Sequence, residues 1–515
     1  MHPRISTHLP LAETQHGFRP GRSTSTALLP LVQKVVTGFN QRCPPRRTVA
    51  MAVDFSKAFD TVNHTALLRS LTSTSLPPND LRWLFTYLRG RTASCSYNRV
   101  DSARIILHLG VPQGSILSPL LFNYYVSTYP SSSELYTSYA DDFTACASNT
   151  KFDQAAAALA EHAGDVTNWA QERSLLISAQ KSTVTLFTSE TKQSNLHPTV
   201  PLDGTPLPLE RNPKILGVTF DPHLFFHKHV EEIVKKAKPR LNLLKQLTGT
   251  DWGQQKETIL VTFKSLIGSL ITYAAPVWFP NTSRSSIAKL QTIQNSALRI
   301  ATGCVKMTDI DHLHTEAKTL KVGEHLKMLC SQFLATCLQP NHVSFPIVNA
   351  DSGPRRIKQS LQTGFRDQIN DLLVDGRTTD IKEARKIIHT RAVREAIGSR
   401  NNNKVLSTAA PEVDVTEMDL PRAARTTLAQ LRSSYCSSLN TFKHHIDSSQ
   451  PPVCPCCRQA DHTTGHLFDC PEHPTELSPL DLWQRPGEAV EFLRTWPCLE
   501  RLHRERPPPE PPPTS

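Results

Sequence analysis

Long apolar runs are absent from this chain, and their absence limits where it can work. No stretch of 18 or more apolar residues occurs, although a membrane-spanning helix needs about 20. The N-terminal segment MHPRISTHLPLAETQHGF also lacks the apolar core of a secretory signal. We therefore expect no signal peptide, no transmembrane segment and no membrane partner, and we expect an intracellular protein of the nucleus or cytoplasm.

Cysteine is sparse along most of the sequence. The 515 residues include 12 cysteines, of which four lie between Cys454 and Cys470 and the others are scattered. Disulfide frameworks belong to short secreted chains with regularly spaced cysteines. This distribution instead predicts reduced thiols and one local metal site.

Acidic residues are too few to balance the basic ones. There are 57 Lys and Arg against 46 Asp and Glu, which gives a formal net charge of +11 and a pI near 9.1. Such a balance favours an anionic partner, and nucleic acid is the commonest one. A merely soluble basic protein is the alternative that charge alone leaves open. The length allows two to four domains.

Apolar periodicity predicts a mixed first half and a helical second half. Residues 49–53 form an apolar run typical of a buried strand, and Asp54 stands at its end. Residues 135–146 predict two strands joined by a turn at Asp141 and Asp142. Helical, basic patterns dominate from about 223 to 445. Further expected elements are helices at 63–71, 79–89, 118–125 and 154–172, and strands at 183–188 and 215–220.

Three carboxylates stand out because they follow or join predicted strands: Asp54, Asp141 and Asp142. Taken singly, each is explained by the preference of Asp for turns and strand ends. Taken together, they could bind two divalent ions about 4 Å apart, the arrangement that assists phosphoryl transfer at a 3′-hydroxyl. Magnesium prefers such hard oxygen ligands. Without ions, grouped like charges would repel each other.

Five segments, in the same order, resemble the reverse transcriptases of non-LTR (LINE-like) retrotransposons. Val53–Asp60 resembles the first catalytic motif of that family, and Tyr139–Asp142 resembles its catalytic hairpin. The other three are Gln15–Thr24 (end of the fingers), Gly110–Pro119 (primer and template contacts) and Ile215–Gly217 (strand after the palm). The resemblance covers roughly residues 15–310. It implies an RNA-directed DNA polymerase that uses an RNA template, a DNA primer and deoxynucleoside triphosphates (dNTPs).

The resemblance also implies roles for individual residues. Asp54, Asp141 and Asp142 would hold two Mg²⁺ ions, with Mn²⁺ as a possible substitute, and the Phe55 carbonyl would assist. Phe59 would be an aromatic gate that clashes with a ribonucleotide 2′-hydroxyl; core packing is the alternative.

Weaker assignments come from the same resemblance. Gln113 and Gly114 would let the template and incoming base approach closely, since glycine has no side chain; an ordinary turn is the alternative. Lys181 would neutralise or protonate the departing pyrophosphate, or is a plain surface lysine. Arg19 and Arg22 would bind phosphates, or lie in a solvated loop.

Near the C-terminus, Cys454, Cys457, His466 and Cys470 have the spacing C-x2-C-x8-H-x3-C. Thiolates and imidazole at such spacing suit tetrahedral Zn²⁺. Substitutes within the cluster are open: Cys456 for either neighbouring cysteine, and His462 or His473 for His466. Chance clustering and redox-active thiols are the alternatives to a metal site. The spacing resembles the zinc segment that follows the polymerase in many such elements.

We therefore expect an α+β protein, a right-hand polymerase palm with a helical thumb, a helical region and a small zinc knuckle. The expected divisions are partial fingers (1–45), palm (46–222), thumb or connection (223–310), a basic helical region (311–447), a CCHC zinc knuckle (448–475) and a Pro-rich tail (476–515).

The length of the chain before and around the motifs predicts how much of such a retrotransposon protein it represents. Little fingers sequence precedes Gln15, and an endonuclease domain has no room, so we expect an N-terminally truncated piece or a degraded copy. We find no ribonuclease H carboxylate set in 311–445. A catalytically inactive nucleic-acid-binding remnant, and a cellular or intron-derived relative in RNA processing, are the competing functions.

Overall fold

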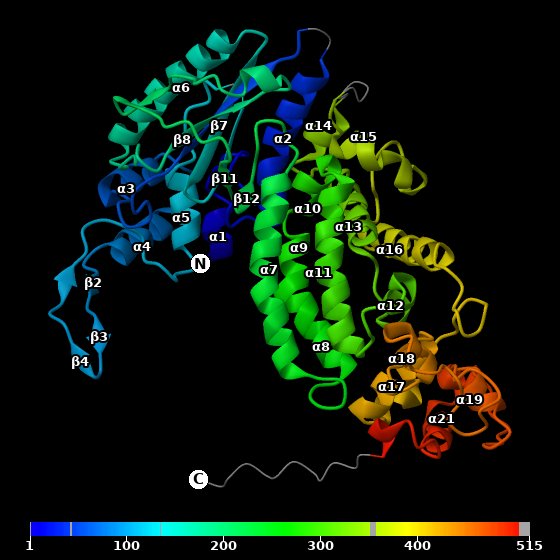
Figure 1. Ribbon diagram of the computed structural model, residues 1–515. Coiled ribbons are helices and arrows are strands. Elements are labelled where there is room, and N and C mark those ends of the chain that lie inside the picture. The colour runs from blue at the N-terminus through cyan, green and yellow to red at the C-terminus, as the bar shows by residue number, and fades with distance from the viewer. Residues whose placement is uncertain (1, 42–43, 134, 351–356, 504–515) are drawn as a thin grey trace. The chain divides into compact units, whose positions relative to one another are not determined.

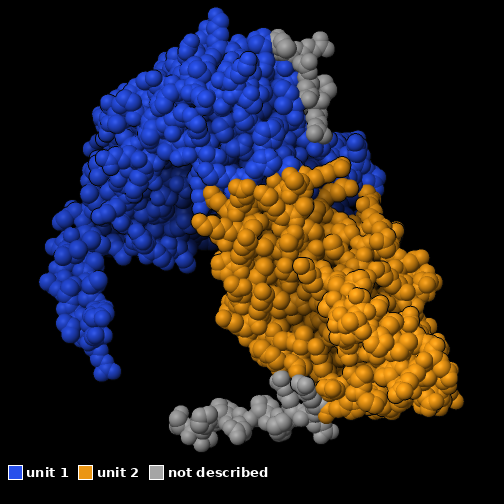
Figure 2. Space-filling model, in the orientation of Figure 1, with its two compact units in different colours: residues 1–229, 274–283, 329–388 blue, residues 230–273, 284–328, 389–515 orange. Residues whose placement is uncertain are grey.

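The computed structural model describes residues 2–41, 44–133, 135–350 and 357–503 (Figure 1). The chain divides into two compact units whose segments alternate along the sequence. Unit 1 comprises residues 1–229, 274–283 and 329–388, and unit 2 comprises residues 230–273, 284–328 and 389–515 (Figure 2). Each compact unit thus combines segments that are distant in the sequence, and the divisions expected from 223 onwards stay a prediction.

Unit 1 is built on a four-stranded antiparallel sheet in the order β6-β7-β1-β8. Its strands are β1 (Arg47–Val53), β6 (Leu135–Tyr139), β7 (Asp142–Asn149) and β8 (Thr183–Phe187). Val49, Met51 and Val53 of β1 join the core cluster with helix α6 (Phe152–Glu172). The alternate residues Thr48 and Ala50 are also buried. Burial on both faces explains why this strand is a continuous apolar run.

Helices and short ribbons surround this sheet. Helix α2 (Thr24–Asn40) contacts β1, β6 and β7. Asn63 caps α3 (His64–Thr72) by accepting from the Ala66 N–H, as its position predicted. The other elements of unit 1 are α1 (His2–Ser6), α4 (Pro78–Leu88), β2 (Thr92–Ala93), β3 (Ser96–Tyr97), β4 (Val100–Asp101), β5 (Ile105–Ile106), α5 (Ser118–Tyr125), η1 (Thr191–Gln193), β9 (Pro201–Leu202), β10 (Thr205–Pro206), β11 (Lys214–Ile215), β12 (Val218–Thr219), α10 (Ala275–Trp278), η3 (Phe279–Asn281), α14 (Phe345–Asn349), α15 (Leu361–Phe365), η4 (Arg366–Gln368) and η5 (Asn370–Leu372).

Among the described residues of unit 2, the regular secondary-structure elements are all helices, joined by loops. Three helices, α7 (His227–Leu247), α13 (Val322–Cys337) and α16 (Ile381–Gly398), run across the division between the units. The remaining elements are α8 (Lys256–Phe263), η2 (Lys264–Gly268), α9 (Ser269–Thr272), α11 (Arg284–Thr302), α12 (Ile310–Glu316), η6 (Val415–Asp419), α17 (Arg422–Arg432), α18 (Asn440–Ile446), α19 (His466–Asp469), α20 (Asp481–Gln484), α21 (Pro486–Leu493) and η7 (Glu500–Leu502).

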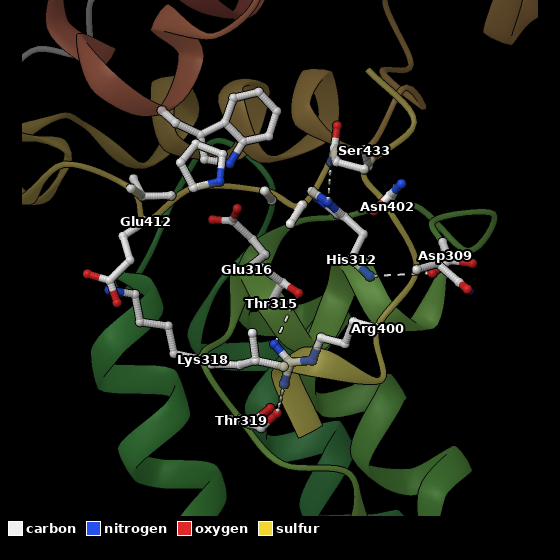
Figure 3. Close-up of a pocket in the computed structure, with 18 of the residues that line it drawn as sticks. Asp309, His312, Thr315, Glu316, Lys318, Thr319, Arg400, Asn402, Glu412 and Ser433 are labelled. Carbon is white, nitrogen blue, oxygen red and sulfur yellow. Dashed lines mark hydrogen bonds between the residues drawn. The ribbon is translucent and has the colours of Figure 1, made fainter. Parts of the chain in front are cut away.

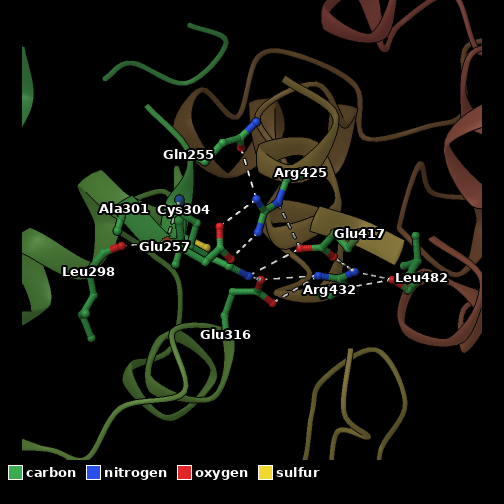
Figure 4. Close-up of polar contacts among 12 residues, drawn as sticks. Gln255, Glu257, Leu298, Ala301, Cys304, Glu316, Glu417, Arg425, Arg432 and Leu482 are labelled. Atoms are coloured by element: carbon green, nitrogen blue, oxygen red, sulfur yellow. Dashed lines mark hydrogen bonds and ion pairs between the residues drawn. The ribbon is translucent and has the colours of Figure 1, made fainter. Parts of the chain in front are cut away.

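A buried network of ion pairs joins four elements of unit 2 (Figure 4). Arg432 of α17 is fully buried and pairs with Glu316 of α12 and Glu417 of η6. Lys256 of α8 contacts the same two carboxylates, at 2.9 and 3.4 Å. Arg425 of α17 lies 3.7 Å from Glu417. Charged side chains are buried inside a protein only when they are paired with opposite charges. The four elements must therefore pack in the arrangement that pairs these charges.

The C-terminal region corrects the expected Pro-rich tail. Residues 477–502 fold against the cysteine cluster, and the side chains of Trp483 and Trp496 are buried in the same core as Cys454 and Cys470. The apolar spacing in this segment was overlooked because the prolines beyond it dominate the composition. The proline run at 507–513 lies outside the described residues.

One stretch of the described residues, Lys256–Asn281, is long and apolar enough to cross a membrane by length and composition alone. The search for uninterrupted apolar runs did not predict it. The support for a span is weak, because core helices of soluble proteins satisfy the same criterion. The helix is also interrupted, since Ala274 has a left-handed backbone with φ of 47°.

Candidate active site

Asp54 lies where β1 ends, beside the start of β7. The preceding residue, Val53, pairs with Phe143 of β7. The Asp54 backbone is held in two directions: its N–H donates to Ser182 Oγ at 3.0 Å, and its carbonyl accepts from the Ser178 N–H at 2.8 Å. Sequence analysis missed both serines. Their closeness to Lys181 in the sequence was the available signal.

Asp141 and Asp142 lie at the connection between β6 and β7. Tyr139 pairs with Asp142, so the hairpin loop is the two-residue turn Ala140–Asp141. Ala140 is buried and has φ of 57°, a left-handed conformation. The structure therefore brings Asp54 and the two aspartates of the hairpin to one end of the sheet, although almost 90 residues separate them in the sequence.

The electrostatics of Asp142 reflect this grouping. Burial, followed by the negative charges of Asp141 and Asp54, raises the pKa of Asp142 above its ordinary value. Like charges that crowd together favour protonation or a bound cation. Carboxylate oxygens are the ligands that Mg²⁺ prefers, so the donor chemistry of these three residues fits divalent ions.

The segment at Gly110–Pro119 is held beside the residues that follow β1. Gly110 has φ of 85°, and a Cβ atom there would lie 2.8 Å from the Asp60 carbonyl oxygen, so only glycine fits. Gln113 is exposed and donates from Nε2 to Asp60 Oδ1 at 3.1 Å. Gly114 is also exposed, with φ of 84° and open space around it. Gly114 was predicted as a site residue, whereas Gly110 was named only as the first residue of the Gly110–Pro119 segment.

The two phenylalanines after Asp54 lie in different surroundings. Phe55 is buried, and its ring packs against Phe143 and Trp169, so its side chain belongs to the core. Phe59 is partly buried and stacks on Phe122, with ring centroids 4.2 Å apart. Its ring thus contacts the core through Phe122, a neighbour that spacing alone did not reveal.

The predicted basic residues have different environments. Lys181 is exposed, next to Ser182. The Arg22 side chain is only 7% exposed, pairs with Glu13, and donates from Nη1 to the Gln15 carbonyl at 3.0 Å. Arg19 donates to the Ala12 carbonyl at 2.6 Å. Both guanidinium groups are occupied by protein acceptors, so phosphate binding by Arg19 or Arg22 remains a prediction without structural support.

Four side chains of the C-terminal cluster converge. One ligand atom from each of Cys454, Cys457, His466 and Cys470 lies within 4.8 Å of the others. Cys454 Sγ is 4.0 Å from Cys470 Sγ, and Cys457 Sγ is 3.2 Å from His466 Nε2. Ligand atoms around tetrahedral Zn²⁺ are about 3.3–3.8 Å apart, so this group could hold such an ion.

The predicted ligand Cys457 and the alternative residues of the cluster differ in their surroundings. A backbone hydrogen bond from Gln459 is the main cause that lowers the pKa of Cys457 to about 6, and this favours the thiolate that binds metal. The pKa of Cys456 is raised, chiefly by burial. His462 is buried and accepts from the Asn440 N–H at 3.1 Å. The ring of His473 stacks on Trp496.

A cavity of about 580 Å³ lies within unit 2 (Figure 3). Arg400 lines it and donates to Thr315 Oγ1 at 3.1 Å and to the Thr319 carbonyl at 3.0 Å. Lys256 and Glu316 of the buried ion-pair network form part of its wall. None of its lining residues was predicted as a site residue, because they come from segments that are far apart in the sequence, among them α8, α12, α16 and α20.

The sheet of unit 1 and its grouped carboxylates lie in a region that matches a known family. Residues 1–220 match the family described as Reverse transcriptase (RNA-dependent DNA polymerase). The match covers the four-stranded sheet and the three grouped aspartates, so this region of mixed helix and sheet is similar to reverse transcriptases, which are nucleotidyltransferases. The resemblance predicted from the five sequence motifs is confirmed.

The relatives are more specific. The chain is 26% identical over 72% of its length to the "Probable RNA-directed DNA polymerase from transposon X-element" of Drosophila melanogaster. It is 24% identical over 70% of its length to the "RNA-directed DNA polymerase from mobile element jockey" of the same species. Each alignment covers 40% of the relative, so the chain spans well under half of their length. Both relatives are named as RNA-directed DNA polymerases, one from a transposon and one from a mobile element.

A solved structure with some likeness is telomerase from Candida albicans in complex with a fragment of telomeric RNA. It shares 11% identity, and the alignment covers 63% of this chain and 52% of that one, with a TM-score of 0.27. That similarity is too low to support an argument about function.

Proposed function

We propose that this chain is the RNA-directed DNA polymerase of a non-LTR retrotransposon, adding dNTPs to a primer 3′-end on an RNA template. The observation that carries the proposal is the position of Asp54 beside the β6–β7 hairpin, within the region that matches the reverse transcriptase family. In this assignment the sheet of unit 1 is the palm, and the helices within residues 223–310 act as the thumb or connection. Since its substrates are nucleic acids, the protein would work in the nucleus or cytoplasm.

Each group of the site has a role that follows from its position. Asp54, Asp141 and Asp142 would hold two divalent ions, which lower the pKa of the primer hydroxyl and neutralise the triphosphate when bound. Ser178 and Ser182 hold the Asp54 backbone so that its carboxylate needs little rearrangement. Phe59 would exclude the 2′-hydroxyl of ribonucleotides. Gln113 and Gly114 are exposed, so template and incoming base can approach them.

A zinc site at Cys454, Cys457, His466 and Cys470 is a second part of the proposal. The convergence of three sulfurs and one imidazole nitrogen supports it. The ion would stabilise the C-terminal fold, because Cys454 and Cys470 belong to the same core as Trp483 and Trp496. A site of this kind would contact RNA or single-stranded DNA beside the polymerase, as zinc knuckles do.

Primer extension on poly(rA)–oligo(dT) with Mg²⁺ tests the polymerase. Asp141→Asn should lower the extension rate at least about 100-fold, since even outer-shell partners of metal ligands are worth 10–100-fold. Asp153→Asn, an exposed carboxylate at the start of α6, is the matched control and should extend like the parent. Absence of extension by the parent, with template–primer binding retained, would identify the inactive binding remnant instead.

A further inference from the structure

The turn that carries Asp141 is built on a residue that disfavours its own conformation. Ala140 is the first residue of a two-residue hairpin loop and has φ of 57°. Glycine, asparagine or aspartate normally occupies such a position, because a Cβ atom crowds the backbone there. An alanine persists in this conformation only where its surroundings hold it. The hairpin strands pair up to Tyr139 and Asp142 and leave the Ala140 backbone outside the ladder.

The missing contacts come from a distant segment, Thr14–Gly17. The Gln15 side chain is 1% exposed and binds Ala140 in both directions. Its Nε2 donates to the Ala140 carbonyl at 3.0 Å, and its Oε1 accepts from the Ala140 N–H at 2.9 Å. A side-chain amide thus replaces the neighbouring strand that this peptide lacks. The backbone continues the pairing: the His16 N–H donates to the Ser138 carbonyl at 2.8 Å, and the Ser138 N–H donates to the Thr14 carbonyl at 2.9 Å.

The segment is itself held against movement from several sides. The Gly17 N–H donates to Gln15 Oε1 at 2.8 Å, which orients the amide. Asn123 of α5 donates to the Gly17 carbonyl at 2.8 Å, and Arg22 donates to the Gln15 carbonyl at 3.0 Å. Gly17 has no side chain to collide with Ala140, whose backbone nitrogen occupies the space of a Cβ atom. These contacts make the segment a rigid support.

From this geometry we infer that Gln15 is a positioning residue for the polymerase site: through the Ala140 backbone it fixes the direction of the Asp141 and Asp142 carboxylates. The inference rests on the proposed function for its catalytic consequence, but its structural part concerns the turn alone. Gln15 touches neither substrate nor metal. Arg22 contributes to the same support, because its hydrogen bond to the Gln15 carbonyl holds the Gln15 backbone in place.

The test compares Gln15→Met with Gln430→Met. Methionine keeps the length of the side chain and removes its hydrogen bonds. Gln430 is the matched control because it is equally buried, at 1%, and binds backbone groups at both ends: Nε2 donates to the Gly303 carbonyl at 2.7 Å, and Oε1 accepts from the Ser437 N–H at 3.3 Å. It belongs to unit 2, whereas the hairpin belongs to unit 1.

The first readout is amide hydrogen exchange of residues 136–143 in metal-free protein, followed by mass spectrometry. Gln15→Met should speed exchange there at least about tenfold, because the Ala140 backbone loses its partners; Gln430→Met should not change it. This readout does not depend on polymerase activity. Unchanged exchange in Gln15→Met would overturn the inference, whether or not the parent extends primers.

The second readout is steady-state extension with the parent as reference. Gln15→Met should lower kcat by about 100-fold, the effect expected from misplacing a reacting group by about 1 Å, and should leave KM for template–primer within about twofold. Gln430→Met should retain kcat. Equal losses of kcat in the two variants would mean a general stability effect and overturn the positioning role. A parent that fails to extend, with faster exchange in Gln15→Met, would refute the polymerase proposal and leave the support of the turn intact.

Discussion

Replacing Arg432 with methionine should destabilise unit 2 in a pH-dependent way. The Arg432 side chain is fully buried, and its partners Glu316 and Glu417 are 2% and 3% exposed. Methionine keeps much of the volume but leaves the carboxylates with fewer cationic partners. Breaking a buried pair by removing one partner costs about 3–5 kcal/mol. For a domain of this size each kcal/mol lowers the melting temperature by about 2–4 °C, so we expect a shift of about 10 °C at pH 7.

The sign of the pH dependence follows from Glu316. Burial by itself raises its pKa, but the charges of Lys256 and Arg432 overcome this and hold the pKa well below the ordinary value. The parent therefore gains stability from ionised Glu316 above the unfolded pKa of about 4.3 and loses it as the pH falls further. Without Arg432 the pKa of Glu316 must rise, so protonation relieves the uncompensated charge. The difference between parent and Arg432→Met should shrink from pH 7 to pH 4.

Urea unfolding followed by circular dichroism at several pH values measures both effects. Lys289→Met is the control, because Lys289 belongs to the same unit and pairs with Glu231 at the surface, where the two side chains are 51% and 60% exposed. The midpoint of this control should stay close to that of the parent. The reasoning is refuted if Arg432→Met unfolds like the parent at pH 7, or if its deficit is the same at pH 4.

Three further outcomes are expected. Gly110→Ala should lose more activity in extension assays and more stability in melting assays than Gly21→Ala. Both glycines have positive φ, but of the two only Gly110 has backbone atoms where a Cβ atom would lie. Equal effects of the two substitutions would contradict the steric argument. Cys457→Ser should lose bound zinc by elemental analysis while Cys456→Ser keeps it, since only Cys457 belongs to the converging group; the reverse order would exclude this ligand set. Phe59→Val should raise ribonucleotide incorporation relative to deoxynucleotide by about tenfold or more in single-nucleotide extension, and an unchanged ratio would assign Phe59 to core packing on Phe122.

Local patterns predicted much of unit 1. The apolar run at 49–53 corresponds to β1, and the helices expected at 63–71 and 154–172 correspond to α3 and α6. Such features depend on nearest neighbours along the chain and on burial of one face. The helix expected at 118–125 corresponds to α5, whose N-cap is Leu117. The Ser118 hydroxyl does not cap this helix, because it donates to the Pro112 carbonyl at 2.7 Å.

The sequence alone determined the residue types that can perform the chemistry: three aspartates at strand ends, and three cysteines with one histidine at metal-binding spacing. Composition and spacing are sufficient there, because metal ligands must be particular atoms at particular intervals. Only the tertiary structure decided what supports them. Gln15 reaches Ala140 across more than 120 residues, Ser182 reaches Asp54, and Arg432 meets Glu316 from another helix. Such pairs leave no periodic signal in the sequence. Each partner satisfies a buried polar or charged group, and that group is buried only once the chain has folded.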